Sequence, residues 1–164
     1  MDTQRMSHLY EKFILAYYQR HFPTLSVSAP QIPWVLDEGD GELLPVMQTD
    51  MQLEQGGNVL IIDAKYYRHI LQSRYETVKL RSAHLYQIFT YVKNRAYERQ
   101  DGHRVSGMLL YAGTDEALQP DHIYQMHGNQ IEVKTLDLSR PFEEIAGALD
   151  AIVNTYFPSC FVRK

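Results

Sequence analysis

The feature that most constrains the fold is a strand-like run, Val59–Tyr66, with two apolar faces. Because side chains alternate along a strand, its faces are Val59 and Ile61 on one side and Leu60, Ile62 and Ala64 on the other. A strand that is apolar on both faces is normally a central one covered from both sides. The run therefore predicts a sheet that lies between two packed layers.

This run is also the second arm of a predicted β-hairpin. The first arm is Leu43–Glu54, and Gln55-Gly56-Gly57-Asn58 between the arms is a good hairpin signal. If Gly56-Gly57 is the two-residue loop, Gln55 pairs with Asn58, and Asp50 falls directly opposite Asp63. Opposed residues share a face, with Cβ atoms ~4.5–5.5 Å apart.

Two aspartates that face each other destabilise a hairpin unless something neutralises them. Lys65 lies on the same face as Asp63, two residues further on, where a buried strand emerges. Mg²⁺ prefers oxygen ligands and is commonly held by one or two carboxylates together with water and substrate phosphate. We therefore expect Asp50 and Asp63 to gather a magnesium ion. The alternative is an ordinary Asp63–Lys65 ion pair beside a solvent-facing Asp50.

The rest of the pattern predicts an α/β fold with a mixed central sheet flanked by helices, in a single domain over residues 1–164. The expected elements are a helix at 5–21, an extended segment at 24–36, an acidic loop Asp37–Glu42, the hairpin, a loop at 67–77, a helix at 78–99, a strand Val105–Ala112, a short hairpin Ile123–Met126 and Ile131–Thr135 turning at Gly128-Asn129, and a closing helix at 142–157.

Charge is distributed unevenly along the chain. The net charge of −4 does not suggest a nucleic-acid partner, yet the stretch from Lys65 to Arg104 holds nine Lys/Arg and three acidic residues. Such a basic segment can meet phosphates, although a solvated helix face gives the same pattern. The single cysteine, Cys160, cannot form an internal disulfide, which suits a reducing cytosol, and no apolar run reaches the ~18 residues of a membrane span.

The spacing Asp50-x12-Asp63-Ala64-Lys65 resembles the PD-(D/E)xK nuclease signature, with Thr49 in place of the proline. Four longer segments resemble the nuclease domain of the McrC family, the cleavage subunits of McrBC methylation-dependent restriction systems. They are LYEKF (9–13), LLPVMQTDMQLE (43–54), LIIDAKYY (60–67) and LYQIFTYV (85–92). The resemblance runs from residue 5 to residue 157.

The resemblance implies a restriction-endonuclease-like core with the order α-β-β-β-α-β, followed by a C-terminal hairpin and helix. It also implies Mg²⁺-dependent DNA cleavage, in which Mn²⁺ can substitute. Asp50 and Asp63 would ligate the metal, with the Ala64 carbonyl as a further ligand. Lys65 would position or deprotonate the attacking water and stabilise developing charge.

Three more side chains match positions of related nucleases. Glu11 corresponds to a glutamate at the edge of the metal site, or is a surface carboxylate. Gln87 and Tyr91 match a Q-x3-Y element and share a helix face, where they would orient Lys65, a water or a phosphate. The alternative is a half-buried polar pair. His84 lies beside Gln87 and is more commonly a structural residue.

The candidate phosphate contacts follow the catalytic strand: Arg68, Arg74, Lys79 and Arg81. No recognition-helix motif is present, so we expect little intrinsic sequence specificity. Relatives of the McrC type carry an additional N-terminal region that engages the GTP-hydrolysing partner McrB, whereas this sequence begins almost at the first nuclease helix.

The sequence also lacks a G-x4-GK[ST] loop, so it should not bind GTP itself. The expected partners are DNA, a McrB-like AAA+ GTPase and, for double-strand cleavage, a second copy of the chain. Two alternatives remain, a non-catalytic DNA-binding or assembly subunit that retains the fold, and a nuclease acting on RNA or on DNA ends.

Overall fold

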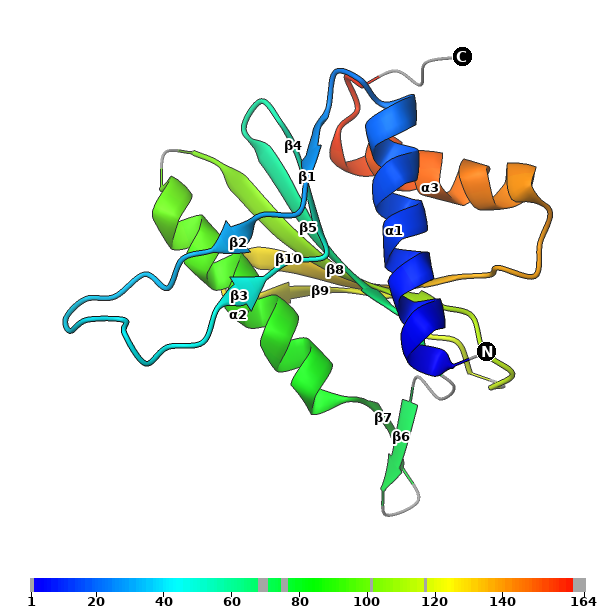
Figure 1. The fold of residues 1–164 in the computed structure, drawn as a ribbon, viewed down its shortest axis with the longest axis horizontal. Coiled ribbons are helices and arrows are strands. Elements are labelled where there is room, and N and C mark those ends of the chain that lie inside the picture. Colours follow the sequence, from blue (N-terminus) through cyan, green and yellow to red (C-terminus); the bar gives the residue numbers. More distant parts are fainter. Residues whose placement is uncertain (1, 68–70, 75–76, 101, 117, 161–164) are drawn as a thin grey trace.

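A six-stranded mixed sheet, in the order β1-β4-β5-β8-β10-β9, forms the middle layer of the protein (Figure 1). The computed structural model describes residues 2–67, 71–74, 77–100, 102–116 and 118–160, and only the backbone of the described residues between 71 and 78. The elements are α1 (Thr3–His21), β1 (Ser26–Ser28), β2 (Gln31–Ile32), β3 (Met47–Gln48), β4 (Met51–Gln55), β5 (Asn58–Lys65), β6 (Leu71–Arg74), β7 (Thr77–Leu80), α2 (Ser82–Arg99), β8 (Arg104–Ala112), β9 (His122–Met126), β10 (Asn129–Leu136) and α3 (Phe142–Tyr156).

The expected mixed sheet flanked by helices is confirmed. Helices α1 and α3 cover one face of the sheet and α2 covers the other (Figure 1). Strand β5 lies in the interior of the sheet, antiparallel to β4 and parallel to β8. Leu60, Ile62 and Ala64 pack toward α1 and α3, whereas Val59 and Ile61 pack toward α2. The doubly apolar run is therefore a central strand, and the alternation of its side chains carries Asp63 and Lys65 to the α2 face.

The predicted hairpin register is confirmed. Gln55 pairs with Asn58 across Gly56-Gly57, and Met51 pairs with Ile62. Gly56 has a φ of +58°, a conformation that costs glycine little and favours it in tight turns. Asp50 precedes the first paired residue of β4, so the same register directs it toward Asp63.

A close approach between α2 and β8 fixes the second layer. A Cβ atom at Gly107 would lie 2.6 Å from Val92 Cγ2 and 2.8 Å from Ile88 Cγ1. Val92 and Ile88 are fully buried. Because only glycine leaves this space, the helix can pack directly on the sheet beside the middle of β5, where Gly107 pairs with Ile61.

Several predicted boundaries were wrong. The expected strand Leu43–Glu54 is interrupted, since residues 43–46 are not strand and β3 and β4 are separated by a bend at Asp50. The expected loop at 67–77 contains strand β6 and the first residue of β7, the rest of β7 lies where the helix at 78–99 was expected, and α2 begins at Ser82 instead of 78. Strands β6 and β7 pair with each other and not with the main sheet, so no sheet-facing apolar alternation marks them in the sequence.

The last hairpin also differs from the prediction. Its turn is His127-Gly128, one residue earlier than expected, and both residues have positive φ values, 50° and 88°. Two consecutive positive φ values match the turn type that joins twisted antiparallel strands. The hairpin extends the main sheet, because β10 pairs in parallel with β8.

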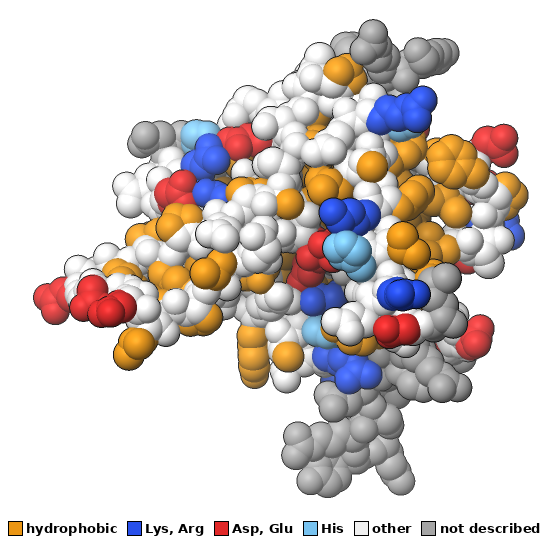
Figure 2. Space-filling model, viewed as in Figure 1, with side chains coloured by type: hydrophobic (Ala, Val, Ile, Leu, Met, Phe, Trp, Pro, Cys, Tyr) orange, Lys and Arg blue, Asp and Glu red, His pale blue; other side chains and the backbone are white. Residues whose placement is uncertain are grey.

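One segment projects from the body of the protein between β2 and β3 (Figure 1). Figure 2 shows acidic side chains gathered at its tip, where Asp37, Glu38, Asp40 and Glu42 are exposed. Apolar side chains along it are also exposed, and Leu43 is 96% exposed. No helix within the described residues has both the length and the hydropathy needed to cross a bilayer.

Candidate active site

Asp50 and Asp63 lie together on the α2 face of the sheet. Asp63 is 4% exposed and stands near the end of β5. Asp50 lies in the bend before β4, and its Oδ2 accepts a hydrogen bond of 2.9 Å from the backbone N–H of Ala64. Burial raises the pKa of Asp50 well above its ordinary range, and a hydrogen bond to Asp63 and the charges of Asp63 and Glu11 raise it further. Without a cation, the two carboxyl groups therefore compete for ionisation.

Lys65 contacts the second aspartate. Its Nζ lies 3.0 Å from Asp63 Oδ2 and donates a hydrogen bond of 2.7 Å to Gln87 Oε1. Asp63 Oδ2 is buried, yet within the described part of the chain it accepts no hydrogen bond of good geometry. A buried carboxylate oxygen in contact with a single ammonium group retains capacity for a second positive ligand.

The donor atoms fit Mg²⁺. Two carboxylates are adjacent, and one of them keeps an oxygen that accepts no hydrogen bond from the described residues. The N–H and C=O of one strand residue point to the same strand edge, so the Ala64 carbonyl faces the edge on which Asp50 lies. Among the described residues no three His, Cys, Asp or Glu side chains form a ready metal-binding group. A cation that keeps water molecules and takes phosphate oxygens suits such a partial ligand set.

The predicted Gln87–Tyr91 pair forms a chain of contacts behind Lys65. Gln87 Nε2 donates to Tyr91 OH at 3.0 Å, and Tyr91 OH donates to the Gln48 carbonyl at 3.2 Å. Gln87 thus accepts from the lysine on one side and is held by the tyrosine on the other. Through these residues α2 connects Lys65 to the strand that precedes Asp50.

Glu11 and His84 flank this cluster. Glu11 is half-buried on α1, and its charge is one of those that raise the pKa of Asp50. His84 is 8% exposed, and its Nδ1 lies 2.7 Å from Tyr111 OH. Burial, followed by the charge of Lys65, lowers the pKa of His84 to about 4, so the imidazole is neutral near pH ~7. The hydrogen bond described for the His84 ring joins it to Tyr111.

Tyr111 was not identified from the sequence. It pairs with Lys65 across the parallel ladder of β5 and β8, and its ring lies 5.8 Å from that of His84. The register between parallel strands far apart in the sequence leaves no local signal like that of a hairpin turn. The sequence therefore predicted Tyr111 only as part of an apolar strand.

The four predicted phosphate contacts are only partly described. Arg68 lies outside the described residues, as does the side chain of Arg74. Lys79 is exposed on β7. Arg81 stands at the N-cap of α2, with its guanidinium carbon 5.9 Å from the ring centroid of Tyr67. The two described cations therefore precede the helix that carries Gln87.

Comparison with known proteins finds similarity to components of restriction systems. Residues 4–112 match a family described as "McrBC 5-methylcytosine restriction system component". The curated protein "Type IV methyl-directed restriction enzyme EcoKMcrBC" of Escherichia coli (strain K12) is 30% identical over 158 residues, which cover 94% of this chain and 44% of that protein.

A solved structure has the same fold. It is the half-complex from a tetradecameric assembly of Thermococcus gammatolerans McrB AAA+ hexamers with bound McrC, and one of its chains aligns with a TM-score of 0.60 and 17% identity. The alignment covers 90% of this chain and 33% of that chain. This chain thus spans less than half the length of either relative.

Proposed function

We propose, from the premise that this chain belongs to the McrBC 5-methylcytosine restriction system component family and is of the McrC type, that it is a Mg²⁺-dependent DNA endonuclease domain of the PD-(D/E)xK type. The observation that carries the proposal is the trio of half-buried Asp50 and buried Asp63 and Lys65, in which Asp63 Oδ2 lies 3.0 Å from the lysine and accepts no hydrogen bond of good geometry from the described residues.

Asp50 and Asp63 would hold the cation, with the Ala64 carbonyl as a further ligand. When bound, Mg²⁺ lowers the pKa of a coordinated water and offsets phosphate charge, and Mn²⁺ can do the same. Asp50 must give up its proton for this role, which the raised pKa makes difficult in the absence of a cation. Cation binding and ionisation of the pair are therefore linked.

Lys65 supplies the fixed positive charge. Of its three ammonium hydrogens, one is donated to Gln87 Oε1 at 2.7 Å and one can face Asp63 Oδ2 at 3.0 Å, so among the described contacts one remains for a phosphate oxygen or for the attacking water. Water adds to phosphorus, the P–O bond to the leaving group breaks, and the leaving oxygen takes a proton. A positive charge placed where the phosphate gains negative charge accelerates such a step.

Cleavage of supercoiled plasmid DNA in a Mg²⁺ or Mn²⁺ titration tests the proposal. We expect Asp63→Asn and Lys65→Ala each to lower the rate by about 100-fold or more. Arg140→Ala is the matched control, because it removes a cation from an exposed ion pair with Glu144. Wild-type rates in both active-site variants would remove the assignment, and DNA binding without metal-dependent cleavage would favour a non-catalytic subunit.

Gln87→Leu separates positioning from binding. Loss of the Gln87 carbonyl leaves Lys65 with Asp63 as its remaining described partner. We expect kcat to fall by roughly 10-fold with little change in KM, as for an interaction used in the transition state. Thr90→Ala is the control on the same helix, since the Thr90 hydroxyl bonds the Tyr86 carbonyl away from the site. A change in KM alone would contradict this role.

The proposed partners are DNA and a McrB-like AAA+ GTPase. The T. gammatolerans assembly contains McrB AAA+ hexamers with bound McrC, and this suggests the second partner. Cleavage assays with methylated and unmethylated plasmid, with and without such a GTPase and GTP, test both dependences. Pairing of two copies of the chain for double-strand cleavage is tested by the ratio of linear to nicked product.

A further inference from the structure

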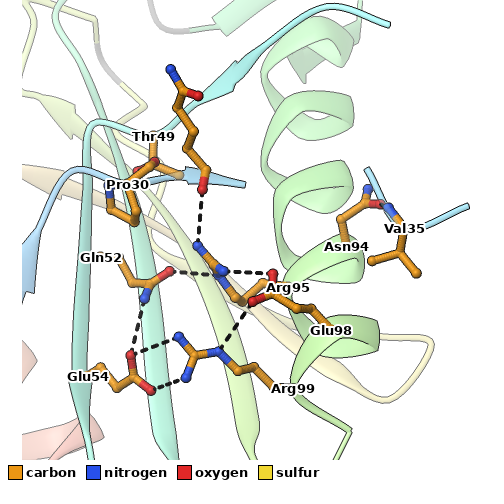
Figure 3. A network of polar contacts seen from close by, with 10 residues as sticks. Pro30, Val35, Thr49, Gln52, Glu54, Asn94, Arg95, Glu98 and Arg99 are labelled. Atoms are coloured by element: carbon orange, nitrogen blue, oxygen red, sulfur yellow. Dashed lines mark hydrogen bonds and ion pairs between the residues drawn. The ribbon is translucent and has the colours of Figure 1, made fainter. Parts of the chain in front are cut away.

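A polar stripe runs along α2 on the side that faces β4. Every fourth residue of the helix contributes a polar side chain: Gln87, Tyr91, Arg95 and Arg99. Figure 3 shows the second half of this stripe, where Arg95 and Arg99 point from α2 toward Gln52 and Glu54. In the first half, Gln87 accepts a hydrogen bond from Lys65 and donates one to Tyr91.

Arg95 is the most deeply buried charge of the stripe, at 5% exposed. Its Nε donates to Gln52 Oε1 at 3.0 Å, its Nη1 to Glu98 at 2.8 Å and its Nη2 to the Gln31 carbonyl at 3.4 Å. One guanidinium group thus joins α2 to β4 and β2. An apolar side chain at this position would avoid the desolvation cost of burying a charge. The role of Arg95 is therefore better explained by the positions of the groups that it holds than by a gain in folding stability.

The geometry in question is that of Asp50. The bend that holds Asp50 interrupts the strand, so its backbone is not fixed by the β4–β5 ladder, which begins at Met51. Two contacts from α2 bracket it symmetrically in the sequence. Tyr91 OH bonds the carbonyl of Gln48, two residues before Asp50, and Arg95 bonds the side chain of Gln52, two residues after it.

The residue directly before Asp50 is also anchored. Thr49 Oγ1 and Thr49 N both bond the carbonyl of Pro30, at 2.6 and 3.2 Å. Pro30 precedes Gln31, whose carbonyl accepts from Arg95. Arg95 therefore contacts the chain that follows Asp50 and the segment that anchors the residue before it.

We propose that Arg95 is a positioning residue that, through Gln52 and the Gln31 carbonyl, sets the placement of Asp50 beside Asp63 and so the affinity of the pair for a divalent cation. The inference rests on the proposed function, because it concerns the same metal site.

The test measures Mn²⁺ binding without DNA by isothermal titration calorimetry, alongside thermal unfolding. We expect Arg95→Met to raise the Mn²⁺ dissociation constant about 10- to 100-fold, as for other residues that orient metal ligands. Arg99→Met is the matched control. It removes a guanidinium that bonds Glu54 at 2.6 and 3.2 Å, four residues from Asp50, and should change the constant less than about twofold.

A double variant separates positioning from general stability. Gln52→Leu/Arg95→Met replaces the polar contact by an apolar one, which we expect to regain thermal stability while Mn²⁺ affinity stays low. Should Arg95→Met fail to fold, Gln52→Ala breaks the same contact with a smaller change and should weaken Mn²⁺ binding likewise. Unchanged affinity in these variants, affinity restored together with stability, or equal losses in Arg99→Met would each overturn the inference.

The failure of the proposed function gives a different result. If Asp63→Asn binds Mn²⁺ as tightly as the wild type, the metal site itself is wrong and the role of Arg95 falls with it. If Asp63→Asn loses Mn²⁺ binding and Arg95→Met keeps it, only the inference about Arg95 is refuted.

Discussion

The carboxyl groups of Asp50 and Asp63 lie so close together that either a proton or a cation is needed to offset their negative charges. Each group is largely removed from water, and the backbone N–H of Ala64 gives Asp50 only partial compensation. Lys65 contacts Asp63 and offsets part of the charge. The pair is thus a costly arrangement for an empty site and a favourable one for a hard cation with oxygen ligands.

This arrangement predicts an unusual dependence of stability on pH. The pKa of Asp50 is raised in the folded chain above the ordinary value of 3.8, so the folded state holds its proton more tightly than the unfolded state. In metal-free buffer we expect stability to fall as pH rises from that value toward the folded pKa, by up to about 1.4 kcal/mol per pH unit. Thermal unfolding in EDTA between about pH 5 and about pH 8 measures the slope.

Asp50→Asn should flatten this slope and also abolish the stabilisation that Mg²⁺ gives the wild type. Asp37→Asn, on an exposed loop, is the control with the same chemical change. Identical slopes in wild type and Asp50→Asn would show that Asp50 does not titrate in this range.

The residues of the site differ in how far the sequence predicts them. Asp50 and Asp63 could be placed opposite each other because a Gly-Gly loop fixes hairpin register locally. The contact between Gln87 and Lys65 was one of three alternatives that the family resemblance offered, and the helix spacing alone could not choose among them, since i,i+4 spacing defines a helix face but not its rotation over a sheet. Arg95 escaped notice for a further reason. A charged residue in an amphipathic helix is expected on the solvated face, and its burial depends on Gln52 of another element.

At the scale of elements, the site requires α2 to lie close against the sheet. Gly107 allows this approach, because side chains of Ile88 and Val92 occupy the place of a Cβ atom. The same helix carries Gln87 and Arg95, so a shift of α2 away from β8 would move both relative to β5. The packing of α2 and the geometry of the candidate site are therefore coupled through one glycine.

We expect Gly107→Ala to destabilise the protein by about 1–3 kcal/mol, the usual cost of overpacking a core. Its Cβ atom would lie 2.6 Å from Val92 Cγ2, so the helix or the side chain must shift. Gly147→Ala on α3 is the control, because no atom lies within 4 Å of its added Cβ and alanine favours helix. Urea unfolding measures both, and a neutral Gly107→Ala would show that α2 has room to adjust.

The elements themselves were predicted where periodicity was strong. The first and last helices and the β4–β5 hairpin follow from spacing of apolar residues and from turn chemistry. The short strands were not predicted: β3 and β4 were merged into one expected strand, β6 was expected to be a loop, and most of β7 was expected to be the start of a helix. Their pairing depends on contacts with β2 or with each other, which leave little trace in local hydropathy.

At the scale of the whole molecule, charge is divided between separate regions. Acidic side chains gather at the tip of the segment between β2 and β3, whereas the stretch from Lys65 to Arg104, which begins at the end of β5, holds nine Lys/Arg and three acidic residues (Figures 1 and 2). A net charge of −4 would oppose DNA if it were spread evenly. If the proposed DNA contacts are right, this uneven distribution would let the basic residues after β5 meet phosphates despite the net negative charge.

This division predicts how salt affects binding. Each phosphate contact releases counterions, so log K falls with log[salt] by about 0.9 per contact for duplex DNA. We expect Lys79→Ala and Arg81→Ala, made in an Asp63→Asn background that does not cleave, each to reduce the slope by about 1. Lys134→Ala removes the same charge from β10, where Lys134 lies 3.9 Å from Glu132 and 4.0 Å from Asp121, and should leave the slope unchanged. Fluorescence anisotropy with a labelled duplex measures all three. Equal changes for Lys134 and for the two candidate contacts would mean that net charge, and not the basic segment beside the site, governs DNA binding.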